Sequence, residues 1–163
     1  MGNFMLVLLI SAAIIGIVCY FGKQRNDRLI AEGKIISRKT NFYEFAEIFT
    51  LSGIDYNRIR SAVDNADFSD LKATVYKDLD GQRKILFRSG YEWNAEISFK
   101  GETDGKYRYR FEFVAWNEHN GIPFRMDTMN MMETKVEKLL LSLDPSASVQ
   151  SVENKLTTKR SFF

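Results

Sequence analysis

The stretch YEWNAEISFKGETDGKYRYRFEFVAW, residues 91–116, decides the fold. Apolar and polar side chains alternate on both sides of its glycine-flanked turn, which is the pattern of a strand with one buried face. A five-residue loop at 101–105 keeps both apolar sets on one face and pairs Phe99 with Tyr107. The stretch therefore predicts an antiparallel hairpin with one covered face.

Two shorter alternating runs precede this hairpin. Three-residue loops at 79–81 and 88–90 keep the apolar residues of all the runs on the same side. The resulting pairs include Val75 with Ile85 and Phe87 with Tyr91. We therefore expect a four-stranded antiparallel meander with one aromatic-rich face and one polar face. Such sheets are typical of two-layer α+β domains, which is the predicted fold class.

Three segments with apolar residues at helical spacing are expected to cover the aromatic face. The first begins at Asn41, where Glu44 completes a helix-start signature, and it ends at Gly53. Asp55 caps a second, short helix, and the third helix occupies 127–143. Two N-terminal helices and one C-terminal helix are thus predicted to pack on one face of the sheet.

The chain begins with a long apolar segment. Residues 4–21, FMLVLLISAAIIGIVCYF, contain neither a charge nor a proline. As a helix this segment is just long enough to cross a hydrocarbon core of about 30 Å. A cleaved secretory signal is the competing interpretation, but no basic residue precedes the apolar run. We therefore predict a transmembrane helix at 1–22 and a single-pass anchor in the lipid bilayer.

Basic residues follow the apolar segment on one side only. Six of the 23 basic residues and two of the 21 acidic residues lie in 23–39, which leaves 17 basic and 19 acidic residues in 40–163. The positive-inside rule then places the N-terminus outside and the globular domain in the cytoplasm. Lys23, Arg25 and Arg28 are expected to contact the membrane surface. The slightly acidic domain has no basic face, so nucleic acid is not an expected partner.

Behind the basic juxtamembrane segment 23–39, residues 40–145 have the length of one α+β globular domain. The tail at 146–163 holds few apolar residues. It is expected either to add an edge strand, beginning at Val149, or to remain disordered.

Reactive side chains are scarce. His119 is the only histidine and Cys19 the only cysteine, so a nucleophilic triad, a histidine metal cluster and a cysteine metal site are all excluded. The run 78–81 resembles the start of a calcium loop, but Phe87 stands where the bidentate glutamate belongs. The sequence contains no phosphate-binding glycine loop. We predict no catalytic residue, no metal and no cofactor.

Several residues of the predicted aromatic face are tyrosine or tryptophan, whose hydroxyl or indole N–H groups an entirely apolar core does not require. The candidate lining residues of a ligand pocket are Tyr91, Trp93, Tyr107, Tyr109, Met129 and Met132. The predicted element order is similar to that of the helix-grip lipid-binding fold, which implies an apolar ligand between sheet and helix. A closed core is the alternative, because aromatic and methionine side chains at these spacings usually pack.

Four apolar residues interrupt the polar face of the predicted sheet: Tyr76, Leu86, Val114 and Trp116. They form a candidate patch for a protein partner or a second copy of the chain, unless the tail covers them. The sequence therefore favours a membrane-tethered, non-enzymatic binding or scaffolding domain. The alternative function is a helix-grip-like domain that binds, or acts on, a small hydrophobic ligand.

Overall fold

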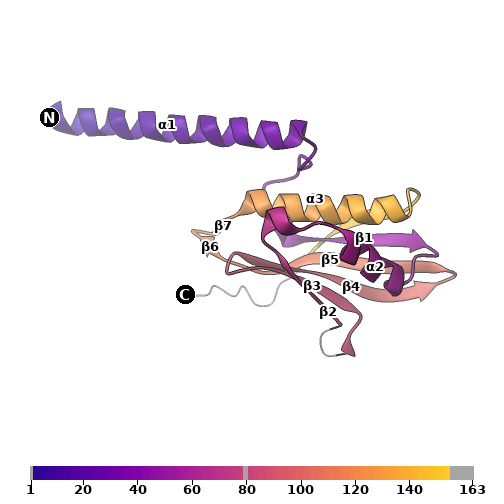
Figure 1. Cartoon of the computed structure of the whole chain (residues 1–163). Helices are drawn as coiled ribbons and strands as arrows, with labels where there is room; N and C mark the ends of the chain where they lie inside the picture. Colours follow the sequence, from indigo (N-terminus) through magenta and orange to yellow (C-terminus); the bar gives the residue numbers. More distant parts are fainter. Residues whose placement is uncertain (1, 79–80, 155–163) are drawn as a thin grey trace. The chain divides into compact units, whose positions relative to one another are not determined.

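The computed structural model describes residues 2–78 and 81–154, and the chain divides into the compact units Met1–Ser37 and Arg38–Phe163 (Figure 1). The first unit is dominated by helix α1 (Gly2–Ala31). Beyond its end Gly33 has φ 66°, and the Lys34 N–H donates to the Leu29 carbonyl at 2.8 Å. This is a Schellman ending, which satisfies the last carbonyls of the helix.

Helix α1 has the physical properties of a membrane span. Residues Met5–Ala31 contain a window of mean hydropathy 2.5, and none of that window is buried inside the protein. One N-terminal helix is therefore long and apolar enough to cross a bilayer, a property that N-terminal signal sequences share.

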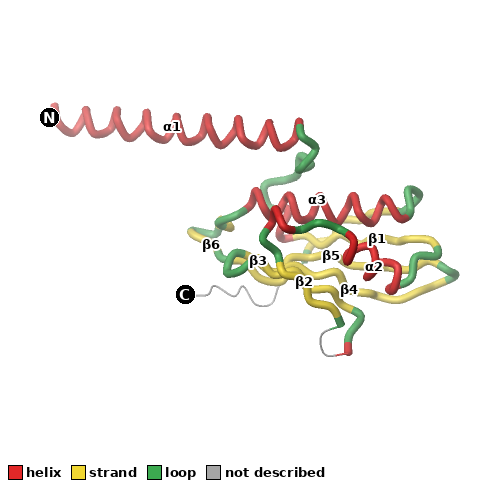
Figure 2. The backbone as a smooth tube through the Cα atoms, in the orientation of Figure 1, coloured by secondary structure: helices red, strands yellow, loops and turns green. Residues whose placement is uncertain are grey.

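The second unit is an α+β domain built on an antiparallel sheet, as predicted, but the sheet has six strands instead of four. Their order is β2-β3-β4-β5-β1-β8. The strands are β1 (Phe45–Ser52), β2 (Thr74–Lys77), β3 (Lys84–Ser89), β4 (Trp93–Thr103), β5 (Lys106–Trp116) and β8 (Ser148–Glu153). A separate two-stranded hairpin consists of β6 (Glu118–His119) and β7 (Ile122–Pro123). Helices α2 (Tyr56–Asn65) and α3 (Met126–Leu143) lie over one face of the large sheet (Figure 2).

The first predicted helix, from Asn41 to Gly53, is wrong. This segment forms a short 3-10 turn, η1 (Phe42–Glu44), and then strand β1. Within β1 the side chains of Glu47, Phe49 and Leu51 are buried on the face toward the helices, which is a period of two. The strand gains partners on both sides, because β5 and β8 each pair with it antiparallel. The tail strand that pairs here is one of the two predicted alternatives for 146–163; residues 155–163 lie outside the described part.

The other two predicted helices are confirmed. The Asp55 carboxylate accepts from the Arg58 N–H at 2.9 Å and caps α2, whose buried side chains include Ile59 and Val63. Helix α3 ends at Leu143, as its sequence pattern predicted.

The predicted hairpin registers are wrong by two or four residues, apart from the ends of β4 and β5, where bulges shift the register further. Phe99 pairs with Tyr109 rather than Tyr107, because the chain turns through only two residues, Asp104 and Gly105, which have φ of 53° and 71°. Two positive φ angles define a type I′ turn, whose twist suits a two-residue hairpin loop. A β-bulge between Phe99 and Gly101 then returns the apolar side chains of β4 to the core face.

The two earlier hairpins differ from the prediction in the same way. Val75 pairs with Phe87, and Ser89 pairs with Trp93. The β3–β4 loop is therefore 90–92 rather than 88–90, and Tyr91 lies at its tip, 94% exposed, instead of facing the core. The predicted loop at 79–81 lies partly outside the described residues.

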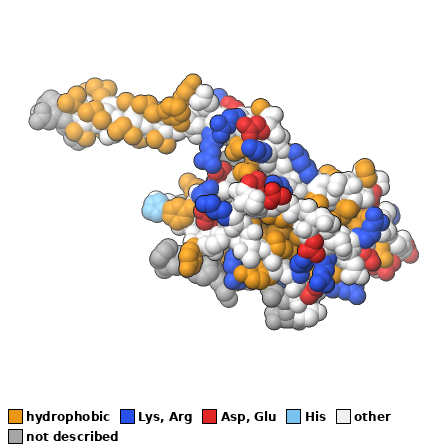
Figure 3. Space-filling model, viewed as in Figure 1, with side chains coloured by type: hydrophobic (Ala, Val, Ile, Leu, Met, Phe, Trp, Pro, Cys, Tyr) orange, Lys and Arg blue, Asp and Glu red, His pale blue; other side chains and the backbone are white. Residues whose placement is uncertain are grey.

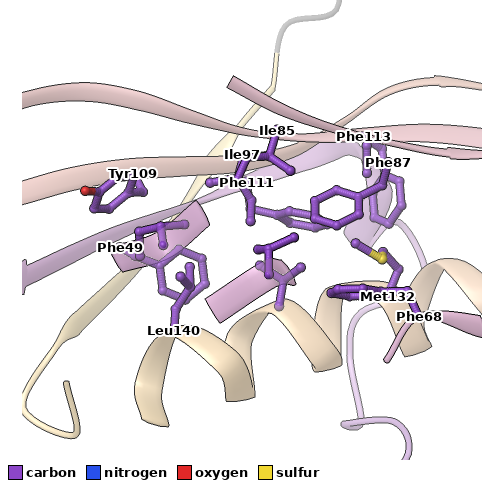
Figure 4. Close-up of a cluster of buried hydrophobic side chains, with 14 of the residues drawn as sticks. Phe49, Phe68, Ile85, Phe87, Ile97, Tyr109, Phe111, Phe113, Met132 and Leu140 are labelled. Atoms are coloured by element: carbon purple, nitrogen blue, oxygen red, sulfur yellow. The ribbon is translucent and has the colours of Figure 1, made fainter. Parts of the chain in front are cut away.

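The hydrophobic core fills the space between the sheet and the two helices. Figure 4 shows it from the side, with sheet residues facing Met132 and Leu140 of α3. The sheet contributes Phe49, Ile85, Phe87, Ile97, Tyr109, Phe111 and Phe113, each at most 1% exposed. Phe111 and Phe113 meet edge to face at 5.4 Å between ring centroids. Such pairs contribute about 0.5–1.5 kcal/mol beyond the area they bury.

Candidate functional site

Four of the six residues predicted to line a pocket lie deep in this core: Trp93, Tyr109, Met129 and Met132, none more than 2% exposed. The polar tips that suggested a ligand have partners within the protein. The Trp93 Nε1–H donates to Thr128 Oγ1 at 2.9 Å, and the Tyr109 hydroxyl donates to the Ile54 carbonyl at 2.7 Å. Of the remaining two, Tyr107 is half-buried and Tyr91 is exposed.

Two residues of the predicted partner patch are neighbours. Tyr76 and Leu86 lie opposite each other on β2 and β3, on the face of the sheet away from α2 and α3. The Arg88 guanidinium lies 5.3 Å from the centre of the Tyr76 ring, a cation–π contact. Val114 lies on the same face of β5, two strands from Leu86.

Trp116 does not belong to this patch. A bulge between Asn94 and Ala95 shifts the register, so that Trp116 pairs with Trp93 and turns toward the core. Only 6% of Trp116 is exposed, and its ring packs on Tyr43 at 5.3 Å. Its placement on the polar face is therefore wrong, because alternation alone could not include the bulge.

The predicted membrane-contact residues Lys23, Arg25 and Arg28 are exposed on α1, which continues well beyond the apolar segment. His119 is exposed on β6, and its ring stacks on Phe124 at 6.3 Å. Within the described residues, no group of three His, Cys, Asp or Glu side chains has an arrangement that could hold a metal ion.

The structure contains a buried charged cluster that sequence reasoning missed. It consists of Arg38, Glu47, Glu133 and Glu137, and we call it the carboxylate cluster. The Arg38 guanidinium lies 2.8 Å from Glu47, 3.4 Å from Glu133 and 2.5 Å from Glu137. The exposed fractions of the side chains are 13% for Arg38, 9% for Glu47, 5% for Glu133 and 20% for Glu137. One arginine thus serves three carboxyl groups almost out of contact with water.

Three separate segments build the cluster. Arg38 is the first residue of the second unit, Glu47 comes from β1, and Glu133 and Glu137 stand one turn apart on α3. Arg38 lies within the predicted basic juxtamembrane segment, 23–39. A detectable signal was present, because Glu133 adjoins the apolar stripe of α3 that contains Met132 and Val136.

The electrostatics of the cluster favour one bound proton. Burial, together with the negative charge of Glu47, raises the pKa of Glu133 from its usual 4.5 to about 9. Burial also raises the pKa of Glu47, against the opposing effect of Arg38. Burial by itself disfavours the charge of Arg38, but the surrounding carboxylates raise the pKa of its guanidinium. Glu133 is therefore neutral at pH 7, which reduces the excess negative charge.

A second feature that the sequence did not predict is a group of exposed apolar side chains at one end of the domain. Tyr91, Ile122 and Phe124 are 94%, 60% and 61% exposed, and we call them the apolar tip. The backbone joins the two loops that carry them, because the Asn117 N–H donates to the Glu92 carbonyl at 2.9 Å and the Phe124 N–H donates to the Asn117 carbonyl at 3.1 Å. Figure 3 shows the pale-blue His119 against hydrophobic side chains at this end.

The domain surface also carries shallow depressions. One of about 400 Å³ is open to solvent between α2 and β2, and it is lined by Val63, Phe68 and Val75 among others. Another of about 460 Å³ lies around Arg83 and Phe99. None of the six residues predicted to line a ligand pocket lines either depression.

Comparisons with known proteins do not assign a family. No protein-family model matches the chain, and no curated protein matches it. Among solved structures, it is similar to pp63/parafusin (phosphoglucomutase) from Paramecium in its open form, with 9% sequence identity and a TM-score of 0.36. That similarity covers 64% of this chain and 22% of the Paramecium protein.

Proposed function

We propose that the protein is a single-pass membrane protein with its N-terminus outside, and that its cytoplasmic domain is a non-enzymatic binding or scaffolding module. The partner would be another protein or a second copy of the chain. The observation that carries the proposal is the Tyr76–Leu86 pair, which lies on the face of the sheet that the described helices leave uncovered. The exposed Tyr76 and the neighbouring Arg88 favour contact with a protein, because aromatic residues and arginine are enriched at protein interfaces.

The arrangement of the reactive groups supports binding over catalysis. His119 has an aromatic ring as its neighbour, and the carboxylate cluster is closed around Arg38. A general acid or base needs access to a substrate, which the 5% exposure of Glu133 does not provide. The internal hydrogen bonds of Trp93 and Tyr109 likewise argue against the alternative of a hydrophobic ligand beneath the sheet.

Site-specific photo-crosslinking in native membranes tests the proposal. A benzophenone amino acid is placed at Leu86 in the full-length protein, and the matched control carries it at Asn57, an exposed position on α2. We expect a discrete protein adduct from position 86 that is missing from position 57. Equal adducts at both positions, or adducts with lipid alone at position 86, would contradict the proposal. Protease accessibility of the domain in sealed vesicles checks the orientation.

A further inference from the structure

The exposed apolar surface of the domain is concentrated at one end. Within the described residues of the second unit, the other exposed large apolar side chains are Tyr76 and Val149, at 38% and 39%. Each residue of the apolar tip has at least 60% of its surface in water. Single exposed apolar residues need no explanation, but three of this size on adjoining loops mark an interaction surface.

The tip is structurally fixed. The β6–β7 hairpin turns through Asn120 and Gly121, with φ of 52° and 78°, and the neighbouring Pro123 is buried. The Arg125 guanidinium lies 2.7 Å from the Glu92 carboxylate, which ties the start of α3 to the β3–β4 loop. Hydrogen bonds, an ion pair and packing therefore hold the backbone that carries the exposed side chains.

The acidic groups next to the tip already have partners. Glu92 pairs with Arg125, and the Glu118 carboxylate accepts from Trp116 Nε1 at 3.1 Å. The ion pair with Arg125 neutralises the Glu92 carboxylate, which reduces its repulsion by a membrane that carries negative charge. The tip itself offers two aromatic rings and one aliphatic side chain, a composition that favours the interfacial zone of a bilayer.

The tip lies at the end of the domain where the chain enters it. The Tyr43 hydroxyl donates to the Gly121 carbonyl at 3.4 Å, and Tyr43 follows Arg38 by only five residues. The helix from residue 22 to Ala31 adds about 15 Å beyond the apolar segment, and the link from Ala31 to Arg38 adds at most about 25 Å. A domain of this size is about 35–40 Å across, so an anchored chain keeps the tip within reach of the bilayer.

We propose that the apolar tip of Tyr91, Ile122 and Phe124 inserts into the interfacial layer of the membrane in which α1 is anchored. The inference rests on the anchor of the proposed function and not on its protein partner. It gives the domain a second attachment to the bilayer and restricts its rotation about the link. The Tyr76–Leu86 pair lies on the sheet face, so the two surfaces are separate.

Tryptophan fluorescence in vesicles tests the proposal. Full-length Phe124→Trp is reconstituted into phosphatidylcholine vesicles with or without bromine in the acyl chains, and its quenching is compared with that of Asn57→Trp. Asn57 is the matched control because α2 begins at the opposite end of the sheet, where the Gly53 N–H donates to the Gly105 carbonyl. Unsubstituted protein supplies the background from its two tryptophans.

We expect brominated lipid to quench Phe124→Trp at least about threefold more strongly than Asn57→Trp, because bromine quenches only at membrane depth. Adding Ile122→Asp to Phe124→Trp should reduce the quenching to the control level. Equal quenching of the two single variants in vesicles that carry the protein on flotation would overturn the inference alone. Emission that shifts with protein density but not with bromine would mean that a second copy covers the tip, and would also overturn it. Failure of the protein to float with vesicles would overturn the anchor together with the inference.

Discussion

Replacing Glu133 by Gln tests the carboxylate cluster directly. The folded protein holds a proton on Glu133 up to a pKa of about 9, whereas an unfolded chain releases it near 4.5. The folded state therefore binds more protons between these two values, and the free energy of unfolding falls as the pH rises from 4.5 to 9. Below 4.5 the contribution is fully present. Glutamine keeps an N–H donor toward Glu47 but cannot ionise, so the variant loses this dependence.

The size of the effect follows from the pKa difference. Each pKa unit corresponds to about 1.4 kcal/mol, and pH 7.5 lies about three units above the value in the unfolded chain, which gives an upper limit of about 4 kcal/mol. The pKa of Glu47 is raised as well, so the two groups share part of the proton affinity. We expect Glu133→Gln to be more stable than the unsubstituted protein by about 2–4 kcal/mol at pH 7.5 and equal to it near pH 4.5.

Urea unfolding of the full-length protein in detergent, followed by tryptophan fluorescence at several pH values between about 4.5 and 8.5, measures both quantities. The buried Trp93 and Trp116 report the loss of the core. Glu96→Gln, on the opposite face of the sheet, removes a similar carboxylate and is the matched control. Parallel pH profiles for Glu133→Gln and the unsubstituted protein would refute the reasoning. A variant less stable at pH 8 would mean that Glu133 is ionised and paired with Arg38.

Three further substitutions have expected effects on the free energy of unfolding. Arg38→Ala leaves buried carboxylates without their cation and should cost about 3–5 kcal/mol in urea unfolding; a loss below about 1 kcal/mol would mean that the cluster admits water. Asp55→Ala removes the cap of α2 and should cost about 1 kcal/mol, with amide exchange in α2 accelerated first; unchanged exchange would contradict this. In Gly105→Ala the alanine has to adopt a positive φ, which should lower the free energy of unfolding by about 1 kcal/mol. A thermal midpoint equal to that of the unsubstituted protein would show that the turn takes up another conformation.

The alternation predicted the buried side of β3 and of most of β4 and β5, but not the register, and Trp116 at the end of β5 lies on the other face than predicted. Ile97 and Phe111 both face the core as predicted, yet they pair with each other, whereas the expected register pairs Ile97 with Tyr109 and Phe111 with Ala95. Which residues of a strand face the core can be predicted from that strand alone. Its register depends in addition on turn type and on bulges. The signal in Asp104-Gly105 was local and readable, since Asp-Gly is a preferred type I′ turn. The bulge after Phe99 had no comparable signal.

Strand β1 shows why tertiary context decides an ambiguous segment. Phe42, Phe45 and Phe49 recur at helical spacing, while Glu47, Phe49 and Leu51 recur at strand spacing. Both periods were present, so only the partners could decide between them. Those partners come from β5 and β8, which lie about 60 and 100 residues further along the chain. The carboxylate cluster could not be predicted from the sequence for the same reason, because Arg38 contacts Glu133 only in the domain in which β1 is paired.

The proposed membrane contact of the domain and its proposed partner surface involve different residues. Arg38 forms an ion pair with Glu47 of β1, and the apolar tip lies at the end of the domain where the chain enters. Tyr76 and Leu86 lie on β2 and β3. In the strand order β2-β3-β4-β5-β1, three or four strand spacings, about 14–19 Å, separate β1 from β3 and β2, whereas Tyr91 of the tip lies on the loop that follows β3. Tyr76 and Leu86 are not among the residues that contact Arg38. Because the tip and the Tyr76–Leu86 pair belong to the same compact unit, an orientation imposed at the tip would also set the direction in which the Tyr76–Leu86 surface faces.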